Sequence, residues 1–100
     1  MNFEEGRLIN LRLADLGASP QTKQATQEPV LIVQAVVTGG TLKVTVSNDN
    51  FVADNRIVCD INGATDTKMD WPLFFVAKSE RVKCEWTGTK AFIRTRGLLP

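Results

Sequence analysis

The sequence predicts a mostly β protein: a small antiparallel β-sandwich or barrel of roughly six to seven short strands, preceded by an N-terminal arm. Two observations predict this class. From Pro29 onward the apolar residues recur with a period of two, and turn residues interrupt that pattern at short, regular intervals. A chain of 100 residues is long enough to form one domain with one modest hydrophobic core. We therefore expect an arm (1–16), a polar linker (17–29) and a β-sandwich domain (30–100).

The arm is rich in aliphatic residues, but its periodicity fits two conformations. Ile9, Leu13 and Leu16 would share one face of a helix, whereas Ile9, Leu11 and Leu13 would share one face of a strand. A short apolar segment cannot bury itself alone, so it either packs back on its own domain or docks on a neighbouring subunit. We predict the second, with four anchor residues: Ile9, Leu11, Leu13 and Leu16.

The segment GASPQTKQATQEP (17–29) contains no large apolar side chain and is rich in Gln, Thr, Ala and Pro. This composition is typical of an extended, solvated connector. Such a connector would tether the arm flexibly to the domain.

The β domain opens with VLIVQAVVT (30–38), which is apolar on both faces, as expected for a central strand or one covered on both sides. Gly39 and Gly40 predict a turn, and TLKVTVS (41–47) then alternates apolar and polar residues as a half-buried strand does. Two strands joined by two glycines predict a β-hairpin.

A second turn signal follows RIVCDI (56–61). Asn62 and Gly63 favour the left-handed conformations of a type I′ turn, so the next segment, ATDTKMDW (64–71), is expected to pair back on that strand. Three further strands are separated by Ser-Glu and Thr-Gly-Thr turns: LFFVAK (73–78), RVKCEW (81–86) and KAFIRTR (90–96).

The last of these strands carries the only basic-plus-aromatic pattern in the chain, on one face: Lys90, Phe92, Arg94 and Arg96. Nucleic-acid recognition needs cations for phosphates and a ring for stacking, so nucleic-acid binding through these residues is the alternative function. Long Lys and Arg stems also cover apolar surface in ordinary sheets. We therefore interpret this face first as a solvated or interface-facing sheet surface.

The charge distribution favours assembly over polyanion binding. The net charge is +1, so no global attraction to nucleic acid or anionic membranes is expected. The middle of the chain is acidic and its C-terminal end is basic, which suits head-to-tail packing of copies. No apolar run is as long as a membrane span, and the acidic N-terminus does not fit a secretory signal, so we expect a cytoplasmic product.

The sequence offers little for catalysis or cofactors. It has no His, which excludes a Cys–His nucleophile pair and imidazole metal ligands. The segment DINGATDTKMD (60–70) has oxygen ligands but lacks the spacing of an EF-hand calcium loop. We expect no enzyme activity, no cofactor and no metal.

The two cysteines, Cys59 and Cys84, are in phase with apolar neighbours along their strands, which predicts two buried free thiols. A disulfide between them is the alternative, although cytosolic thiols stay reduced.

The closing segment WPLFFVAKSERVKCEWTGTKAFIRTRG (71–97) resembles the last strands of small bacteriophage virion proteins, in which an apolar strand, a polar turn, an alternating strand and a TGT-like turn precede a final strand. The layout of arm, connector and sandwich is also similar to that of capsid-associated, head–tail connector and tail accessory proteins. The resemblance implies a non-enzymatic structural subunit, present in many copies in a virion that assembles in the host cytoplasm. Its implied partners are copies of itself and other virion proteins, and no functional residues carry over.

Overall fold

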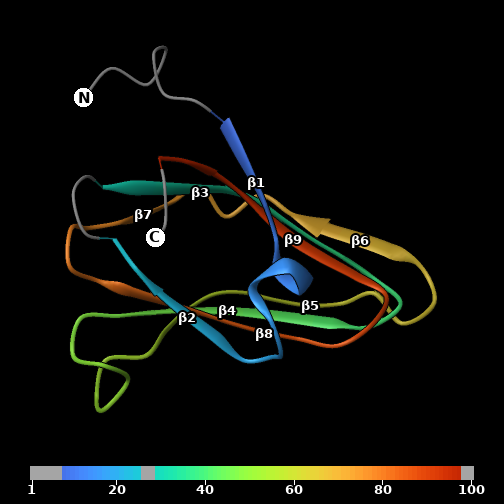
Figure 1. Cartoon of the computed structure of the whole chain (residues 1–100), viewed down its shortest axis with the longest axis horizontal. Helices are drawn as coiled ribbons and strands as arrows, with labels where there is room; N and C mark the ends of the chain where they lie inside the picture. Colours follow the sequence, from blue (N-terminus) through green and yellow to red (C-terminus); the bar gives the residue numbers. More distant parts are fainter. Residues whose placement is uncertain (1–7, 26–28, 98–100) are drawn as a thin grey trace.

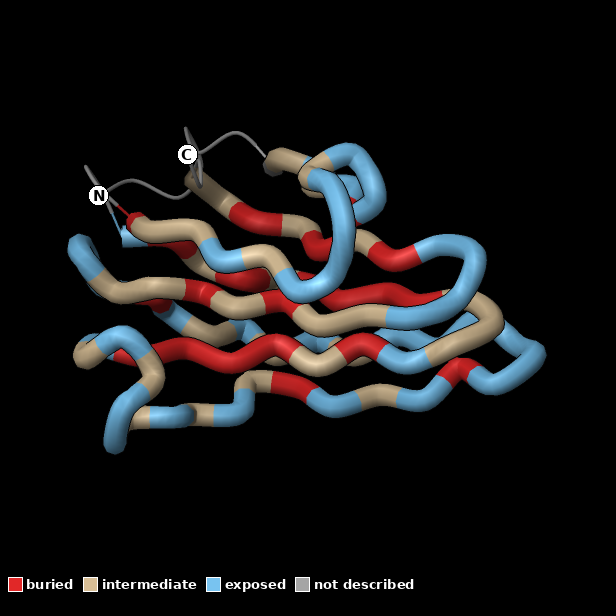
Figure 2. Tube along the Cα trace, turned by 60° about the horizontal axis from the view of Figure 1, so that its bottom comes forward, coloured by how far each residue is buried: buried red, intermediate tan, exposed pale blue. Residues whose placement is uncertain are grey.

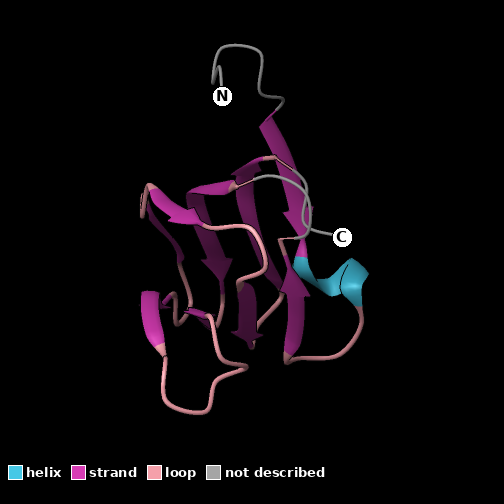
Figure 3. Ribbon diagram, turned by 90° about the vertical axis from the view of Figure 1, so that its left-hand side faces the viewer, coloured by secondary structure: helices cyan, strands magenta, loops and turns pink. Residues whose placement is uncertain are grey.

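The computed structural model describes residues 8–25 and 29–97, which form nine strands and one short 3₁₀ helix. The strands are β1 (Leu8–Arg12), β2 (Gln21–Gln24), β3 (Val30–Thr38), β4 (Thr41–Ser47), β5 (Arg56–Asn62), β6 (Thr67–Asp70), β7 (Phe74–Val76), β8 (Arg81–Trp86) and β9 (Lys90–Arg96). The helix η1 (Leu13–Leu16) joins β1 to β2 and lies to one side of the strands (Figure 3).

The strands form two antiparallel sheets that pack face to face (Figure 1). Sheet A has the order β1-β9-β3, and β6 and β7 share the outer edge of β3. Sheet B has the order β2-β8-β4-β5. The predicted small antiparallel β-sandwich is therefore confirmed.

The strands pair as a long ribbon folded back on itself. β4 pairs with β5, β3 with β6 and β7, β2 with β8, and β1 with β9. Two further pairs, β3 with β9 and β4 with β8, join the wrapped ribbon into two sheets. This nesting of antiparallel pairs across two sheets is the jelly-roll topology.

The hairpins expected at Gly39-Gly40 and at Asn62-Gly63 are wrong. Each turn carries the chain from one sheet to the other: β3 to β4, and β5 to β6. The TGT turn (87–89) does the same between β8 and β9. Within the described residues, only β4 and β5 are both consecutive in sequence and paired. The error arises because a period of two identifies which residues face inward but not which strand lies alongside.

These three crossings meet at one end of the sandwich, where backbone contacts backbone. The Gly39 N–H donates to the Asp66 carbonyl at 3.2 Å, and the Gly63 N–H donates to the Gly40 carbonyl at 2.6 Å. The third crossing is held to the first by hydrogen bonds to β3 and β4 backbone carbonyls. We call this region the glycine corner: residues 39–40, 63–66 and 87–89.

The glycine corner has no room for side chains at three positions, Gly40, Gly63 and Gly88. A Cβ placed on Gly40 would lie 2.6 Å from the Cα of Gly88, and closer still to the Thr87 backbone. A Cβ on Gly88 would lie 2.7 Å from the Gly39 carbonyl oxygen. Real Cβ atoms do not approach backbone this closely, so the two connections can touch only because both lack side chains.

The core lies between the sheets and is built from alternate residues of the strands, as the banding of buried and exposed segments shows (Figure 2). On β3 the alternation shifts at Val33, where the pairing with β9 is irregular. The inward residues before that point are Val30 and Ile32, and those after it are Ala35 and Val37. The largest fully buried side chains come from both sheets and from η1: Leu13, Ile32, Leu42 and Ile93.

Residues 8–16 are not a free arm. β1 pairs along its length with β9, and Leu13 in η1 is completely buried. Leu11 and Leu16 pack against the same core, and Ile9 is half-buried opposite the buried Thr95. The prediction that these four residues anchor the chain on a neighbour is therefore corrected, since they are used in the core of their own domain. Residues 1–7 of the predicted arm lie outside the described residues.

The predicted linker is also part of the sandwich. β2 pairs with β8 at the edge of sheet B, and Ala25 is completely buried. The Ala25 N–H donates to the Glu80 carbonyl at 2.9 Å, and the Ala25 carbonyl accepts from Ser79 N–H. Because an edge strand is held by its backbone groups, this segment needs no apolar period to join a sheet. Residues 26–28 lie outside the described residues.

Replacing Gly40 by Ala is expected to destabilise the protein by about 3 kcal/mol or more, because the new methyl group overlaps backbone. Gly39→Ala is the matched control. Gly39 has a φ of 68°, and the nearest atom to its Cβ would be Thr89 Oγ1 at 3.5 Å, so its cost is conformational, about 1–2 kcal/mol. Urea unfolding followed by tryptophan fluorescence measures both. Equal costs would contradict the close packing at Gly40.

A chain that lacks residues 1–27 is expected not to fold, because it loses β1, β2 and two completely buried side chains, Leu13 and Ala25. In the full chain, Leu13→Ala alone should cost about 2–5 kcal/mol. Thermal unfolding followed by circular dichroism tests both variants. A shortened chain that unfolds cooperatively at the Tm of the full chain would restore the interpretation of an arm and a linker.

Candidate functional site

The four residues of the basic-plus-aromatic pattern lie in one row on the outer surface of sheet A. The residues between them along β9 are buried between the sheets, so the row faces outward. β9 is flanked by β1 and β3, which places the row in the interior of the sheet and not at its edge. The row consists of Lys90, Phe92, Arg94 and Arg96.

Residues of the neighbouring strands extend this surface, because cross-strand partners share a face. Arg12 of β1 lies opposite Phe92, and Asn10 and Gln34 lie on either side of Arg94. None of the strand residues described on this outer face is acidic, although Asp15 of η1 approaches Arg12 at 3.8 Å. We call this surface the basic face: Asn10, Arg12, Gln34, Lys90, Phe92, Arg94 and Arg96.

Arg94 lies at the centre of the basic face and has an unsatisfied hydrogen-bond donor. Its Nε is buried and lacks a partner, and it is the only side-chain atom of the described residues in that state. The neighbouring Gln34 is 6% exposed and donates from its amide nitrogen to the Met69 sulfur at 3.3 Å. A buried donor without an acceptor costs about 1–3 kcal/mol, and more when it is charged.

The exposed large hydrophobic residues of the described chain all lie between positions 52 and 75: Val52, Ile57, Met69, Trp71, Leu73 and Phe75. All but Val52 belong to β5, β6, β7 or the β6–β7 connection. β5 is the edge strand of sheet B, and β6 and β7 form the edge of sheet A on the same side of the sandwich. We call these five residues the apolar edge: Ile57, Met69, Trp71, Leu73 and Phe75.

Leu73 combines two unfavourable features. Its side chain is 63% exposed, and its φ of 48° is in the left-handed region. For a leucine this conformation costs about 1–2 kcal/mol, which glycine or asparagine would largely avoid. Leu73 is also not among the residues that pack against the core.

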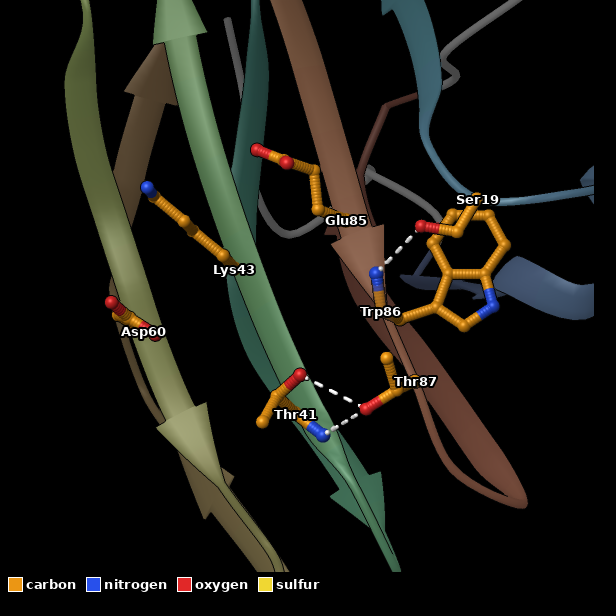
Figure 4. A pocket seen from close by; sticks show the side chains of 7 residues that line it. All are labelled: Ser19, Thr41, Lys43, Asp60, Glu85, Trp86 and Thr87. Atoms are coloured by element: carbon orange, nitrogen blue, oxygen red, sulfur yellow. Dashed lines mark hydrogen bonds between the residues drawn. The ribbon is translucent and has the colours of Figure 1, made fainter.

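A hollow of about 410 Å³ opens on sheet B, lined by residues of several strands and of the η1–β2 connection: Ser19, Thr41, Lys43, Asp60, Glu85, Trp86 and Thr87 (Figure 4). Lys43 lies between Asp60 and Glu85 on adjacent strands, so the charges alternate across the sheet. The hydroxyls are occupied by structural contacts. Thr87 Oγ1 accepts from the Thr41 N–H at 3.0 Å, and Ser19 Oγ accepts from the Trp86 N–H at 2.9 Å.

The hollow therefore offers no group prepared for chemistry. Its hydroxyls hold strands and connections together, and its charged side chains form a mutually compensating row. The indole of Trp86 lies on the far side of β8 from Lys43 and Glu85, toward η1 (Figure 4).

The acidic middle of the chain is also used structurally. The Asp49 carboxylate accepts from the Ala53 N–H at 2.9 Å and from the Ser47 hydroxyl at 2.9 Å, and such hydrogen bonds, led by that from Ala53, lower the Asp49 pKa. Asp54 pairs with Arg56, which also contacts Glu80. Within residues 8–25 and 29–97, no group of three or more acidic or thiol side chains is placed to hold a metal ion.

Cys59 and Cys84 lie on either side of Val44 in sheet B, two strand spacings or roughly 10 Å apart. A disulfide needs a shorter Cα separation, so the predicted buried free thiols are confirmed. Burial raises the pKa of the Cys59 thiol to about 11 and that of Cys84 to about 12. Neither thiol is ionised near neutral pH, so neither is an activated nucleophile.

Sequence reasoning identified the β9 row but missed the rest of the surface. Arg12 was assigned to an arm and Gln34 to a central strand, so nothing placed them beside Arg94. The apolar edge had a signal: Met69, Trp71, Leu73 and Phe75 are alternate positions. The alternation alone does not predict an exposed apolar surface, because it is equally typical of a strand with a buried face.

No protein-family model matches the chain, and no curated protein or solved structure matches it either. No helix within the described residues is long and apolar enough to cross a membrane. A function for this chain must therefore be argued from its two distinctive surfaces, the apolar edge and the basic face.

Both thiols are expected to resist alkylation while the protein is folded, because they are buried and protonated at pH 8. Mass spectrometry after iodoacetamide treatment should detect no modification of native protein and two modifications in about 6 M guanidinium, where both sites are exposed. Rapid labelling of Cys84 in native protein would contradict its burial in the sandwich. Labelling at neither site after unfolding would contradict the free thiols.

Proposed function

We propose that the protein is a non-enzymatic structural subunit that associates with copies of itself through the apolar edge, as a component of a multi-copy particle such as a virion. The observation that carries this proposal is the apolar edge itself. Five large hydrophobic residues, each about half exposed or more, belong to the edge strands β5, β6 and β7 and the β6–β7 connection on one lateral side of the sandwich, and one of them has a left-handed backbone conformation. Met69 and Phe75 project from the outer face of sheet A, and Ile57 projects from the outer face of sheet B.

The size of the apolar edge favours repeated weak contacts over one tight contact. Full burial of a large apolar side chain contributes about 1.5–3 kcal/mol, so burying the exposed part of each contributes roughly half of that. Five such contributions, about 4–7 kcal/mol, barely offset the cost of association for a single pair. When each subunit contacts several neighbours, the second contact forms at high effective concentration, and a stable assembly results.

We infer that the partner is a second copy of this chain. Within the described residues β5 pairs only with β4, so one of its sides offers unpaired backbone groups next to exposed apolar side chains. Such an edge favours pairing with another strand. The net charge of +1 gives copies little mutual repulsion.

The virion setting is supported by two analogies. Jelly-roll domains occur in viral capsid proteins, although lectins and cupins use them too, so the fold alone does not select a function. The closing segment 71–97 resembles the last strands of small virion proteins. The arm plays no part in this proposal, because Leu13 and its neighbours are packed in their own domain.

Self-association is expected at protein concentrations of about 0.1 to 1 mM, and Leu73→Gly should weaken it at least tenfold while raising stability. The gain in stability arises because glycine relieves the positive φ of Leu73. Sedimentation velocity over a concentration series, together with urea unfolding, measures both quantities. A structural role for the Leu73 side chain would instead lower stability.

Val52→Ser is the matched control, because Val52 is 81% exposed but belongs to the β4–β5 loop and not to the apolar edge. It should leave self-association unchanged. A protein that stays monomeric over the whole series, or that loses association equally with Val52→Ser, would overturn the proposal.

A further inference from the structure

The basic face presents a row of cations along one strand. Side chains on the same face of β9 are separated by about 7 Å per two residues, so Lys90, Arg94 and Arg96 form a line with Arg12 beside it on β1. No acidic strand residue interrupts this line on the outer face of sheet A as described. The net charge of the chain is only +1, so the face concentrates positive charge that the whole molecule does not have.

An aromatic ring lies within this row of cations. Phe92 is half-buried, with Arg12 opposite it on β1 and the buried Val36 opposite it on β3. It follows Lys90 and precedes Arg94 along the outer face. A ring in the interior of a sheet, with cations beside it, is the arrangement on which some RNA-binding sheets stack unpaired bases.

The Nε of Arg94 is buried and has no partner, so this guanidinium is not fixed by an acceptor at that atom. Gln34 beside it directs its amide nitrogen to Met69, and the other cross-strand neighbour is the uncharged Asn10. A phosphate oxygen is a strong acceptor for a guanidinium.

We propose that the basic face binds single-stranded nucleic acid. Phosphates contact Arg94 and the cations in line with it, and an unpaired base stacks on Phe92. A duplex keeps its bases stacked on one another and would leave the ring unused. An acidic protein segment would use the same cations but would give Phe92 no role, so the ring favours nucleic acid. The proposal does not depend on the apolar edge, whose residues Met69 and Phe75 lie on the same outer face but across β3 from β9.

The number of cations determines how strongly the basic face is expected to bind nucleic acid and how steeply that affinity falls with salt. Three to four phosphate contacts to a single strand give a slope of log K against log salt of roughly −2 to −3. Affinity should therefore fall about 20- to 50-fold between roughly 50 and 200 mM salt. Binding is expected to be weak and to show little sequence preference, because stacking and phosphate contacts do not distinguish the bases.

Fluorescence anisotropy of a labelled oligothymidine, titrated with the full chain at low and moderate salt, tests the proposal. Arg94→Gln should weaken binding and reduce the salt slope by about 0.7, the contribution of one phosphate contact. Phe92→Leu keeps an apolar cover over Val36 but removes the ring, and should weaken binding about tenfold or more without changing the salt slope. Lys43→Gln is the matched control: it removes one charge from sheet B and should change binding little.

Each alternative result is distinguishable. No binding at low salt overturns the proposal, as does an equal loss for Arg94→Gln and Lys43→Gln, which would assign binding to net charge. Equal affinity for polyglutamate with no effect of Phe92→Leu would assign the face to an acidic protein partner and also overturn it. If thermal unfolding shows that Arg94→Gln does not fold, Lys90→Gln replaces it, because Lys90 is exposed and carries no packing role.

Discussion

The whole fold depends on the glycine corner, where three sheet-to-sheet crossings touch through their backbones. A jelly roll requires the chain to leave one sheet and enter the other repeatedly, and here three of those transfers occur at the same end of the molecule. Gly40 and Gly88 allow the first and third crossings to approach without any intervening side chain. Because the turns are fixed to one another, β3, β4, β8 and β9 leave them in a common register, and the two central pairs of the sandwich follow.

The last strand connects the stability of the domain to its surface chemistry. β9 pairs with β1 on one side and with β3 on the other, so it joins the N-terminal segment to the middle of the chain. Ile93 and its inward neighbours fill the core, whereas Arg94 and its outward neighbours form the basic face. One strand serves both purposes because successive side chains point to opposite sides of a sheet. Its pairings span most of the sequence, which is expected to make closure of sheet A slow.

The two lateral sides of the sandwich differ in a way that bears on association. One side is closed by β1, η1 and β2, and there Leu13 is completely buried beneath the chain. The other side is formed by β5, β6 and β7, where Leu73 and four other large apolar residues are exposed. The N-terminal segment thus covers one side only, and the apolar edge is the place where a further strand or a second molecule would complete the structure. The basic face adjoins this second side, because Met69 and Phe75 lie opposite Val36 and Leu31 of β3 on the same outer face of sheet A, and Gln34 donates a hydrogen bond to Met69.

The sequence by itself determined which residues of β4, β8 and β9 face inward, including the buried thiols and the outward row from Lys90 to Arg96, because alternation encodes the face of a strand. It also determined the class of fold. Only the tertiary structure decided which strands are neighbours, because strands are joined by backbone groups that every residue carries. For that reason Gly39-Gly40 was mistaken for a hairpin, and β2, which has no apolar period, was mistaken for a linker. For the same reason the sequence did not predict that Arg12 and Gln34 lie close to Arg94. These residues come from distant parts of the chain and meet only when β1, β9 and β3 pair.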